Sequence, residues 1–422
     1  MELTQISDLT PSARGEVMSR GSELAAIESD VKQIIDNVRA DGDAALREFS
    51  REFDDVEMNA IEVTGAATKA VETIHSDVQA AIASTIDRIE TFHRHQLRDD
   101  WQADFDGRTL GRQFRPIERA GAYVPGGSAA YPSTAMMTVV PARVAGVNTI
   151  IAVTPPADPI NKVTLAALSL AGVDRIFAAG GAQGIAALAY GTESIPAVDT
   201  IVGPGNRWVA AAKAAVQGDV SIDMIAGPSE VLILADETAD PEFVASDLIA
   251  QAEHDPHASA AAVTPDLELA KRIGDAVRDQ LPKRTRGGVA ESAFSNESSG
   301  IFVAESMDQA VEFTNEYAVE HLGIMTADNE SIVEQIKHAG SIFVGEYSPV
   351  AAGDYSTGPN HVLPTAQTAR VSSGLSVDTF MRSRTVQHLD KSALKDINET
   401  ITTLAELEGL EAHAESIQHR ID

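Results

Sequence analysis

Between residues 117 and 237, short apolar runs alternate with alanine-rich stretches of helical character. The predicted strands cover 149–153, 175–178, 200–202 and 231–234, and the predicted helices lie near 161–171, 183–190 and 206–217. A strand, a helix and a further strand at this spacing form a right-handed βαβ unit, and successive units build a parallel sheet. We therefore expect an α/β domain over 117–237.

The alternation resumes in a second segment, 238–380. Asp240 and Pro241 are typical of a helix start, so a helix is predicted from there to His254. Further strands are predicted at 260–263, 300–303, 322–326 and 341–344. The stretch 347–380 is rich in Gly, Ser, Thr and Pro, and its varied polar residues favour a functional loop over a linker.

The two ends of the chain have helical patterns. Residues 1–116 are predicted to be mainly helical and to pack on the second α/β domain. The tail, 381–422, has a break at Gly409 and few apolar anchors, which is typical of a segment that packs on another subunit. The expected fold is α/β, with two Rossmann-like parallel-sheet domains, an N-terminal helical region and a helical C-terminal tail.

Composition excludes several classes of function. No apolar run approaches the ~20 residues of a membrane span, and the first residues lack the features of a secretory signal, so we expect a cytoplasmic protein without a membrane partner. The net charge of −31 repels nucleic acid and indicates a surface suited to high salt. Without cysteine, neither a thiolate nucleophile nor a thiolate metal ligand is available.

Three glycine-rich turns lie in the first α/β segment, at 123–127, 180–184 and 203–206. The second and third follow predicted strands and open predicted helices, where a parallel sheet presents ligand sites and a helix N-terminus offers free N–H groups to phosphate. The segment has no Gly-x-Gly-x-x-Gly motif. Spacing alone therefore leaves two alternatives, a phosphate or dinucleotide cradle and plain tight turns.

Candidate metal ligands and acid–base groups are scattered along the second half. Gln251 and His254 are three residues apart on one predicted helix face. Asp354 lies in the polar loop and His413 in the tail, and carboxylate and imidazole ligands suit zinc or a similar ion. Glu320-His321 lies where a predicted helix gives way to a strand and can share acid–base work. Spacing cannot bring the four candidate ligands together, and a half-buried histidine beside an exposed glutamate remains the alternative for the pair.

Eight motifs nevertheless occur in a specific order. They are Tyr-Val-Pro-Gly-Gly, Gly-Gly-Ala-Gln, Val-Gly-Pro-Gly-Asn, Ala-Gly-Pro-Ser-Glu, Gln-Ala-Glu-His, Glu-His-Leu, Gly-Asp-Tyr-x-x-Gly-x-Asn-His-Val-Leu-Pro-Thr and Glu-Gly-Leu-x-Ala-His. In this order they resemble the histidinol dehydrogenase family, and the resemblance covers about 35–415. Its specificity comes from the ordered set and exceeds that of any single motif.

The resemblance implies a site for each group. It implies one zinc ion per subunit and NAD as the cofactor. The residues that it implies are, for zinc, Gln251, His254, Asp354 and His413; for NAD, Tyr123, Gln183 and Asn206; for substrate contacts, Ser229 and Glu408 together with the zinc ligands and the acid–base pair; and for acid–base catalysis, Glu320 and His321. It also implies a homodimer whose tail reaches the partner's site.

The chemistry that the resemblance implies is the four-electron oxidation of L-histidinol to L-histidine through L-histidinal, the last step of histidine biosynthesis. Three rival functions remain open. They are a related zinc- and NAD-dependent dehydrogenase of another polar alcohol, such as a sulfonated propanediol; a zinc hydrolase that works without NAD; and an α/β protein that binds a ligand without turnover.

Overall fold

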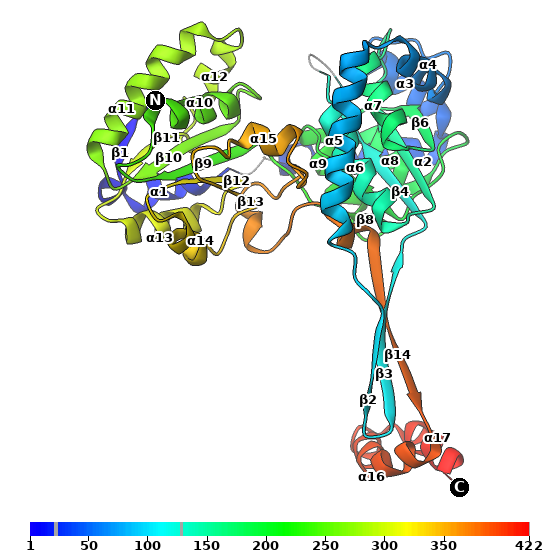
Figure 1. Ribbon diagram of the computed structural model, residues 1–422. Coiled ribbons are helices and arrows are strands. Elements are labelled where there is room, and N and C mark those ends of the chain that lie inside the picture. The colour runs from blue at the N-terminus through cyan, green and yellow to red at the C-terminus, as the bar shows by residue number, and fades with distance from the viewer. Residues whose placement is uncertain (21–23, 127–129, 422) are drawn as a thin grey trace.

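The computed structural model describes residues 1–20, 24–126 and 130–421. The chain forms two α/β bodies side by side, and a thin arm extends from one of them and carries the C-terminus (Figure 1). We call the bodies the five-stranded and the six-stranded body after their sheets. Gly127, the last residue of the first glycine turn, lies outside the described residues.

The five-stranded body is built on a parallel sheet of order β6-β5-β4-β7-β8. Its strands are β4 (Arg119–Tyr123), β5 (Thr149–Thr154), β6 (Arg175–Ala178), β7 (Thr200–Val202) and β8 (Ser221–Ile222). The three strands predicted between 149 and 202 are confirmed. β4 and β8 were not predicted.

Helices cover both faces of this sheet, and they include most of the N-terminal region. One face packs against α4 (Thr64–Thr73), α5 (Ser76–Arg94), α6 (Pro132–Ala145) and α7 (Lys162–Ala171), and the other against α2 (Glu28–Asp41), α3 (Asp43–Phe53), α8 (Gly181–Tyr190) and α9 (Arg207–Val216). The expectation that the N-terminal helices pack on the second domain is therefore wrong for α2 to α5 and right only for α1 (Pro11–Met18). The apolar stripe of α2, which includes Val31, Ile35 and Val38, is buried against α8 and α9 instead.

The six-stranded body has a parallel sheet of order β1-β11-β10-β9-β12-β13. Its strands are β1 (Leu3–Gln5), β9 (Glu230–Ala235), β10 (Ser259–Thr264), β11 (Gly300–Val303), β12 (His321–Met325) and β13 (Ser341–Val344). The prediction of 231–234 as a strand of the first unit is wrong about the sheet, because β9 is an inner strand of this one. The extreme N-terminus adds the edge strand β1, which the helical prediction for 1–116 missed.

Helices cover both faces of the second sheet as well. They are α10 (Pro241–Ala252), α11 (Leu267–Gln280), α12 (Gly287–Ala293) and α15 (Val350–Tyr355) on one face, and α1 (Pro11–Met18), α13 (Met307–Tyr317) and α14 (Asn329–Gln335) on the other. Short 3-10 helices complete the described chain at η1 (Ile6–Asp8), η2 (Leu24–Ile27), η3 (Leu281–Lys283), η4 (Thr368–Arg370) and η5 (Val377–Phe380). The predicted α/β class with two parallel sheets is confirmed.

The arm is an antiparallel ribbon with two helices at its far end (Figure 1). Its strands, in the order β14-β3-β2, are β14 (Met381–Leu389), β3 (Arg108–Pro116) and β2 (Trp101–Phe105), and its helices are α16 (Lys391–Leu407) and α17 (Glu411–Ile421). The helical prediction is therefore wrong for 101–116. The predicted tail helices and their break at Gly409 are confirmed, but the tail starts as a strand.

No helix in the described ranges is both long enough and apolar enough to cross a membrane.

Candidate active site

The two sheets meet through opposite edges. Residues 223–229 run directly from the carboxyl end of β8 in one sheet to the amino end of β9 in the other. A second crossing segment follows α15, where the Asn360 side chain donates to the carbonyl of Met137 in α6 at 2.7 Å. The Thr365 hydroxyl then accepts from the N–H of Gly227 at 2.6 Å. The carboxyl edge of the five-stranded sheet is thereby tied to the amino edge of the six-stranded one.

The glycine turns come together at that carboxyl edge. Tyr123 is the last residue of β4, and its hydroxyl accepts a hydrogen bond from the N–H of Gly181 at 3.1 Å. Gly203 has φ +113 and lies so close to Tyr123 that a Cβ there would come within 2.2 Å of the Tyr123 carbonyl oxygen. Only glycine fits this position. Burial raises the pKa of Tyr123 to about 12, so the hydroxyl stays protonated.

The two other predicted NAD residues lie on the helices that open at the same edge. Gln183 is buried in the first turn of α8, with its side-chain oxygen next to Gly181. Asn206 caps α9, because its side-chain oxygen accepts from the N–H groups of Trp208 at 3.0 Å and Val209 at 3.2 Å. The first turns of two helices and a tyrosine hydroxyl thus lie along one sheet edge, which is the arrangement that suits an anionic cofactor.

The predicted acid–base pair lies at the facing edge, at the start of β12. Glu320 and His321 are buried, and both bond to the main chain of Glu230, the first residue of β9. The N–H of Glu230 donates to Oε2 of Glu320 at 2.7 Å, and its carbonyl lies 3.0 Å from Nδ1 of His321. Since a carbonyl only accepts, Nδ1 carries a proton in both charge states of the ring, and Nε2 has a free lone pair when the ring is neutral.

Asp354 joins this pair from α15. Its Oδ1 lies 3.8 Å from Nε2 of His321 and 4.0 Å from Nδ1 of His361. Nε2 of His321 is buried and has no hydrogen-bond partner among the described residues. Burial lowers the pKa of His321, but the Glu320 and Asp354 carboxylates raise it, and the balance raises it to about 9. Burial lowers the pKa of His361, with Asp354 opposing.

Gln251 and His254 lie at the end of α10, which packs against α15. The Gln251 side chain is buried and its Nε2 has no partner within the described residues. Nδ1 of His254 lies 3.3 Å from the Gln251 carbonyl, so Nε2 is free to bind a metal, as in many histidine ligands that donate their other N–H to a carbonyl. Oxygen and nitrogen donors of this kind suit zinc.

Glu408 and His413 lie elsewhere. Both are exposed and belong to the tail, at the far end of the arm (Figure 1). Within the described ranges of this single chain, no three His, Asp or Glu side chains are grouped so as to hold a metal ion. The structure therefore brings the region of Gln251 and His254 next to that of Asp354, through the packing of α10 on α15, but leaves His413 apart.

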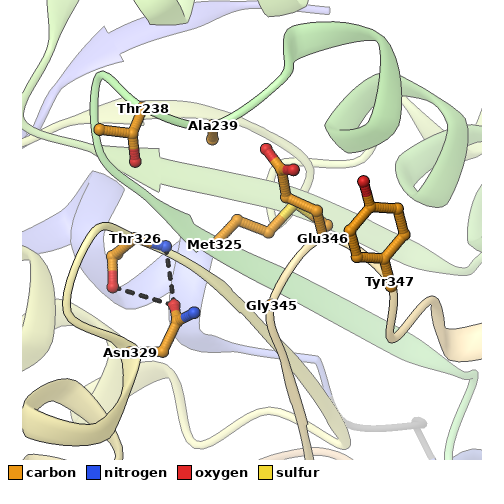
Figure 2. Close-up of a pocket in the computed structure, with 8 residues that line it drawn as sticks. All are labelled: Thr238, Ala239, Met325, Thr326, Asn329, Gly345, Glu346 and Tyr347. Carbon is orange, nitrogen blue, oxygen red and sulfur yellow. Dashed lines mark hydrogen bonds between the residues drawn. The ribbon is translucent and has the colours of Figure 1, made fainter.

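A hollow of about 370 Å³ lies away from these residues (Figure 2). It is lined by residues that follow β9, β12 and β13, among them Thr238, Thr326 and Glu346. It therefore opens at the carboxyl edge of the six-stranded sheet, whereas Glu320 and His321 lie at the amino edge. Thr326 and Asn329 already hydrogen-bond each other there. The convergence of titratable side chains, rather than this hollow, marks the candidate site.

Sequence reasoning assigned no role to three residues of this region. His361 stands in the same motif as Asp354, seven positions later, so the motif itself was the available signal. Glu230 ends the Ala-Gly-Pro-Ser-Glu motif next to Ser229, and Ser229 lies at the crossing where β9 begins. Arg20, which pairs with Glu230, lies outside every motif and had no signal.

Comparison with known proteins decides the family. The sequence matches the family described as "Histidinol dehydrogenase" over residues 18–421. The chain belongs to the histidinol dehydrogenase family. The resemblance drawn from the eight ordered motifs is thereby confirmed, and with it the expectation of an oxidoreductase.

Relatives of this family match the whole chain. The histidinol dehydrogenase of Haloarcula marismortui is 56% identical, and that of Halobacterium salinarum 54%, each with 100% of both chains covered. Among solved structures, histidinol dehydrogenase from Elizabethkingia anophelis has a TM-score of 0.94 at 35% identity, with 100% of this chain and 98% of that chain covered.

Proposed function

We propose that this chain oxidises L-histidinol to L-histidine through L-histidinal, with NAD⁺ as the electron acceptor and one zinc ion per subunit, in the cytoplasm. One observation carries the proposal. Nε2 of His321 is buried and unpartnered in the described structure, next to Asp354, while Nδ1 is held by the Glu230 carbonyl. This is the geometry of a proton acceptor that waits for a substrate group.

His321 takes the hydroxyl proton of the alcohol at Nε2. Its Nδ1–H bond to Glu230 maintains the tautomer that leaves this lone pair free. As the proton leaves, the carbon releases a hydride, which NAD⁺ accepts when it is bound. The ring must be neutral when it accepts the proton, so with a pKa of about 9 the active form gains population as the pH rises toward 9. The nearby Asp354 carboxylate stabilises the ring once it becomes charged.

Glu320 serves the second oxidation, in which the aldehyde is hydrated before it is oxidised. Its Oε2 accepts from the Glu230 N–H at 2.7 Å and lies 3.4 Å from Nδ1 of His321. A carboxylate held in this way can take a proton from the water that attacks the aldehyde. The chain has no cysteine, so the thiohemiacetal route is closed.

The NAD site is proposed at the glycine turns. Tyr123 and Gln183 lie next to Gly181, and Asn206 caps α9 at the same edge. The short crossing 223–229 from this edge to Glu230 supports a cofactor that reaches from the turns toward His321. Its phosphates would lie near the positive ends of the α8 and α9 helix dipoles, where the N–H groups of Gly181, Trp208 and Val209 already bond to Tyr123 and Asn206.

Zinc would be held by Gln251, His254 and Asp354 of one chain and by His413 of a second copy. The free Nε2 of His254 supports this assignment. Gln251 would bind through its side-chain oxygen, because its buried amide nitrogen is only a donor. The role of the metal would be to orient the imidazole and amine of the substrate. Ser229 and Glu408 are proposed as further substrate contacts, and a carboxylate at 408 favours a cationic amine over a sulfonate.

The position of the tail supports a homodimer. The tail exposes Leu404, Leu407 and Leu410, with exposed fractions of 55%, 79% and 42%. Apolar side chains gathered in this way at the end of an arm call for a partner surface. A second copy that received this tail would gain Glu408 and His413 for its site.

The deciding experiment measures NADH formed per L-histidinol consumed, in high potassium chloride, with and without a chelator and added zinc. Two NADH per substrate, lost on chelation and restored by zinc, are expected. One NADH would make the protein a simple alcohol dehydrogenase and remove Glu320 from the hydration step. Turnover of a sulfonated propanediol instead, or hydrolysis without NAD, would replace the proposed substrate or reaction class.

A further inference from the structure

An ion pair is buried directly behind the proposed acid–base pair. Nε of Arg20 lies 3.0 Å from Oε1 of Glu230, and the two side chains are only 2% and 1% exposed. The proposed chemistry uses neither side chain. Burying two charges costs free energy that their attraction often does not recover, so a pair at this position calls for an explanation beyond stability.

The explanation lies in the main chain of Glu230. Glu230 is paired with Ser259 in the ladder between β9 and β10, and the Ser229 carbonyl accepts from the N–H of Ser259 at 3.0 Å. The N–H and carbonyl of Glu230 bond in addition to the side chains of Glu320 and His321. The residue that supports both proposed catalytic groups is therefore the first of its strand.

The side chain of Glu230 supplies further anchorage. Oε1 accepts from the N–H of Ala366 at 2.7 Å, in addition to its contact with Arg20. The Arg20 guanidinium lies over the ring of Tyr317 at 3.7 Å from its centre and donates to the Tyr317 carbonyl. Tyr317 ends α13, three residues before Glu320. Burial raises the pKa of Glu230, and the Arg20 charge opposes that shift.

We propose that Arg20 and Glu230 are positioning residues for the acid–base pair. Their ion pair fixes the Glu230 peptide, which holds the Glu320 carboxylate and directs Nε2 of His321 toward the substrate. The same arginine fixes the end of α13, from which Glu320 follows. This inference rests on the proposed roles of Glu320 and His321. A shift of about 1 Å in such groups can reduce the rate on the order of 10²-fold.

A single substitution cannot separate positioning from stability, because it leaves one buried charge without its partner. The double variant Arg20→Met/Glu230→Gln removes both charges and keeps similar volumes. The Gln amide oxygen can still accept from Ala366. A control is Arg143→Met/Glu90→Gln, which removes a partly exposed ion pair between α6 and α5 (Nη2 to Oε2, 2.6 Å), away from Glu230, together with the contact of Glu90 with Arg94.

The experiment uses the full zinc-loaded enzyme and measures kcat and KM for L-histidinol and L-histidinal, together with the unfolding temperature. For the Arg20/Glu230 double variant we expect kcat to fall by about tenfold or more while both KM values stay within about twofold. The control variant should keep the wild-type kcat. Arg20→Lys keeps the charge but not the planar fork, so it should recover part of the lost kcat.

Two results would overturn the inference. The first is a double variant that folds and keeps the wild-type kcat, with or without a change in KM, which would make the pair purely structural. The second applies if the double variant does not fold: it is a folded Arg20→Lys variant with unchanged kcat. Failure of the proposed function is a separate result, because the wild-type enzyme would then form no NADH from L-histidinol.

Discussion

The hydroxyl of Tyr123 accepts a hydrogen bond from the N–H of Gly181 at 3.1 Å, and this bond links the end of β4 to the first turn of α8. Substituting Tyr123→Phe removes the acceptor and any contact of the hydroxyl with the cofactor. We expect KM for NAD⁺ to rise about fivefold, the equivalent of roughly 1 kcal/mol, with little change in KM for L-histidinol.

The matched control for this variant is Tyr190→Phe. Tyr190 ends the same helix, α8, and its hydroxyl donates to Asp219 at 2.7 Å, at the opposite end from Gly181. Steady-state kinetics with varied NAD⁺ compare the two. Equal effects of both substitutions would contradict a cofactor site at the glycine turns.

Replacing Glu320→Gln should separate the two oxidations. The first needs only the His321 lone pair, whereas hydration of the aldehyde needs the Glu320 carboxylate. The second step should slow on the order of 10²–10⁴-fold, so that about one NADH forms per L-histidinol in the first turnover. The exposed Glu312 on α13 offers the control Glu312→Gln, which should form two. Oxidation of L-histidinal at the wild-type rate by the Glu320→Gln variant would refute the assignment.

Mixing variants tests whether the tail completes the site of a second copy. His254→Asn and His413→Asn should each be inactive alone. Refolded together, half of the dimers would be mixed, and one of the two sites in each would be intact, which restores about a quarter of the wild-type activity. Mixing His254→Asn with Asp354→Asn is the control. It should restore nothing, because α10 and α15 pack together in one chain.

The stability of the fold should depend on the protonation of Asp54. Burial raises the pKa of Asp54 from 3.8 to about 6, and its Oδ2 has no hydrogen-bond partner among the described residues. As the pH rises from about 4 to 6, the unfolded chain releases this proton first, so stability falls across that window and stays lower above it. Asp54→Asn should therefore stabilise the protein by about 1 kcal/mol at pH 7 and by nothing at pH 4.

Urea unfolding at the two pH values measures this effect. Asp55→Asn is the control, because Asp55 is exposed and its φ of 54 is one that asparagine tolerates. Equal gains for the Asp54→Asn variant at pH 4 and pH 7 would show that the carboxyl is not titrating in this window.

The parts of the fold that the sequence predicted are those in which burial leaves a periodic trace. β6, β7, β11 and β13 were predicted with their observed bounds because their short apolar runs stand between turn residues. The sequence of β9 does not indicate which of the two sheets the strand joins. An inner strand of either sheet has the same apolar run, and only the crossing at 223–229 decides.

The arm was missed because its strands bury almost nothing. Every residue of β2 is exposed, so no apolar alternation marks it. The available signal was Asp106-Gly107, both with positive φ of 55 and 79, which is the two-residue turn that a hairpin prefers. The residues of the candidate site also fall into those that the sequence could indicate and those that it could not. Motif residues could be named from their order, but Arg20 came to light only through its contact with Glu230.

The arm also sets an order of events during synthesis. β3 pairs with β14, yet the two strands lie far apart in the sequence. Until β14 leaves the ribosome, the β2–β3 hairpin has an open edge, which is a surface on which chains can aggregate. Arginines are concentrated on the strands that later meet, at 108, 112, 115, 382 and 384, in a chain that is otherwise strongly acidic. Arg108 and Arg115 pair with Asp106 and Asp100, and charged side chains on an open edge disfavour its pairing with another nascent hairpin before its own strand arrives.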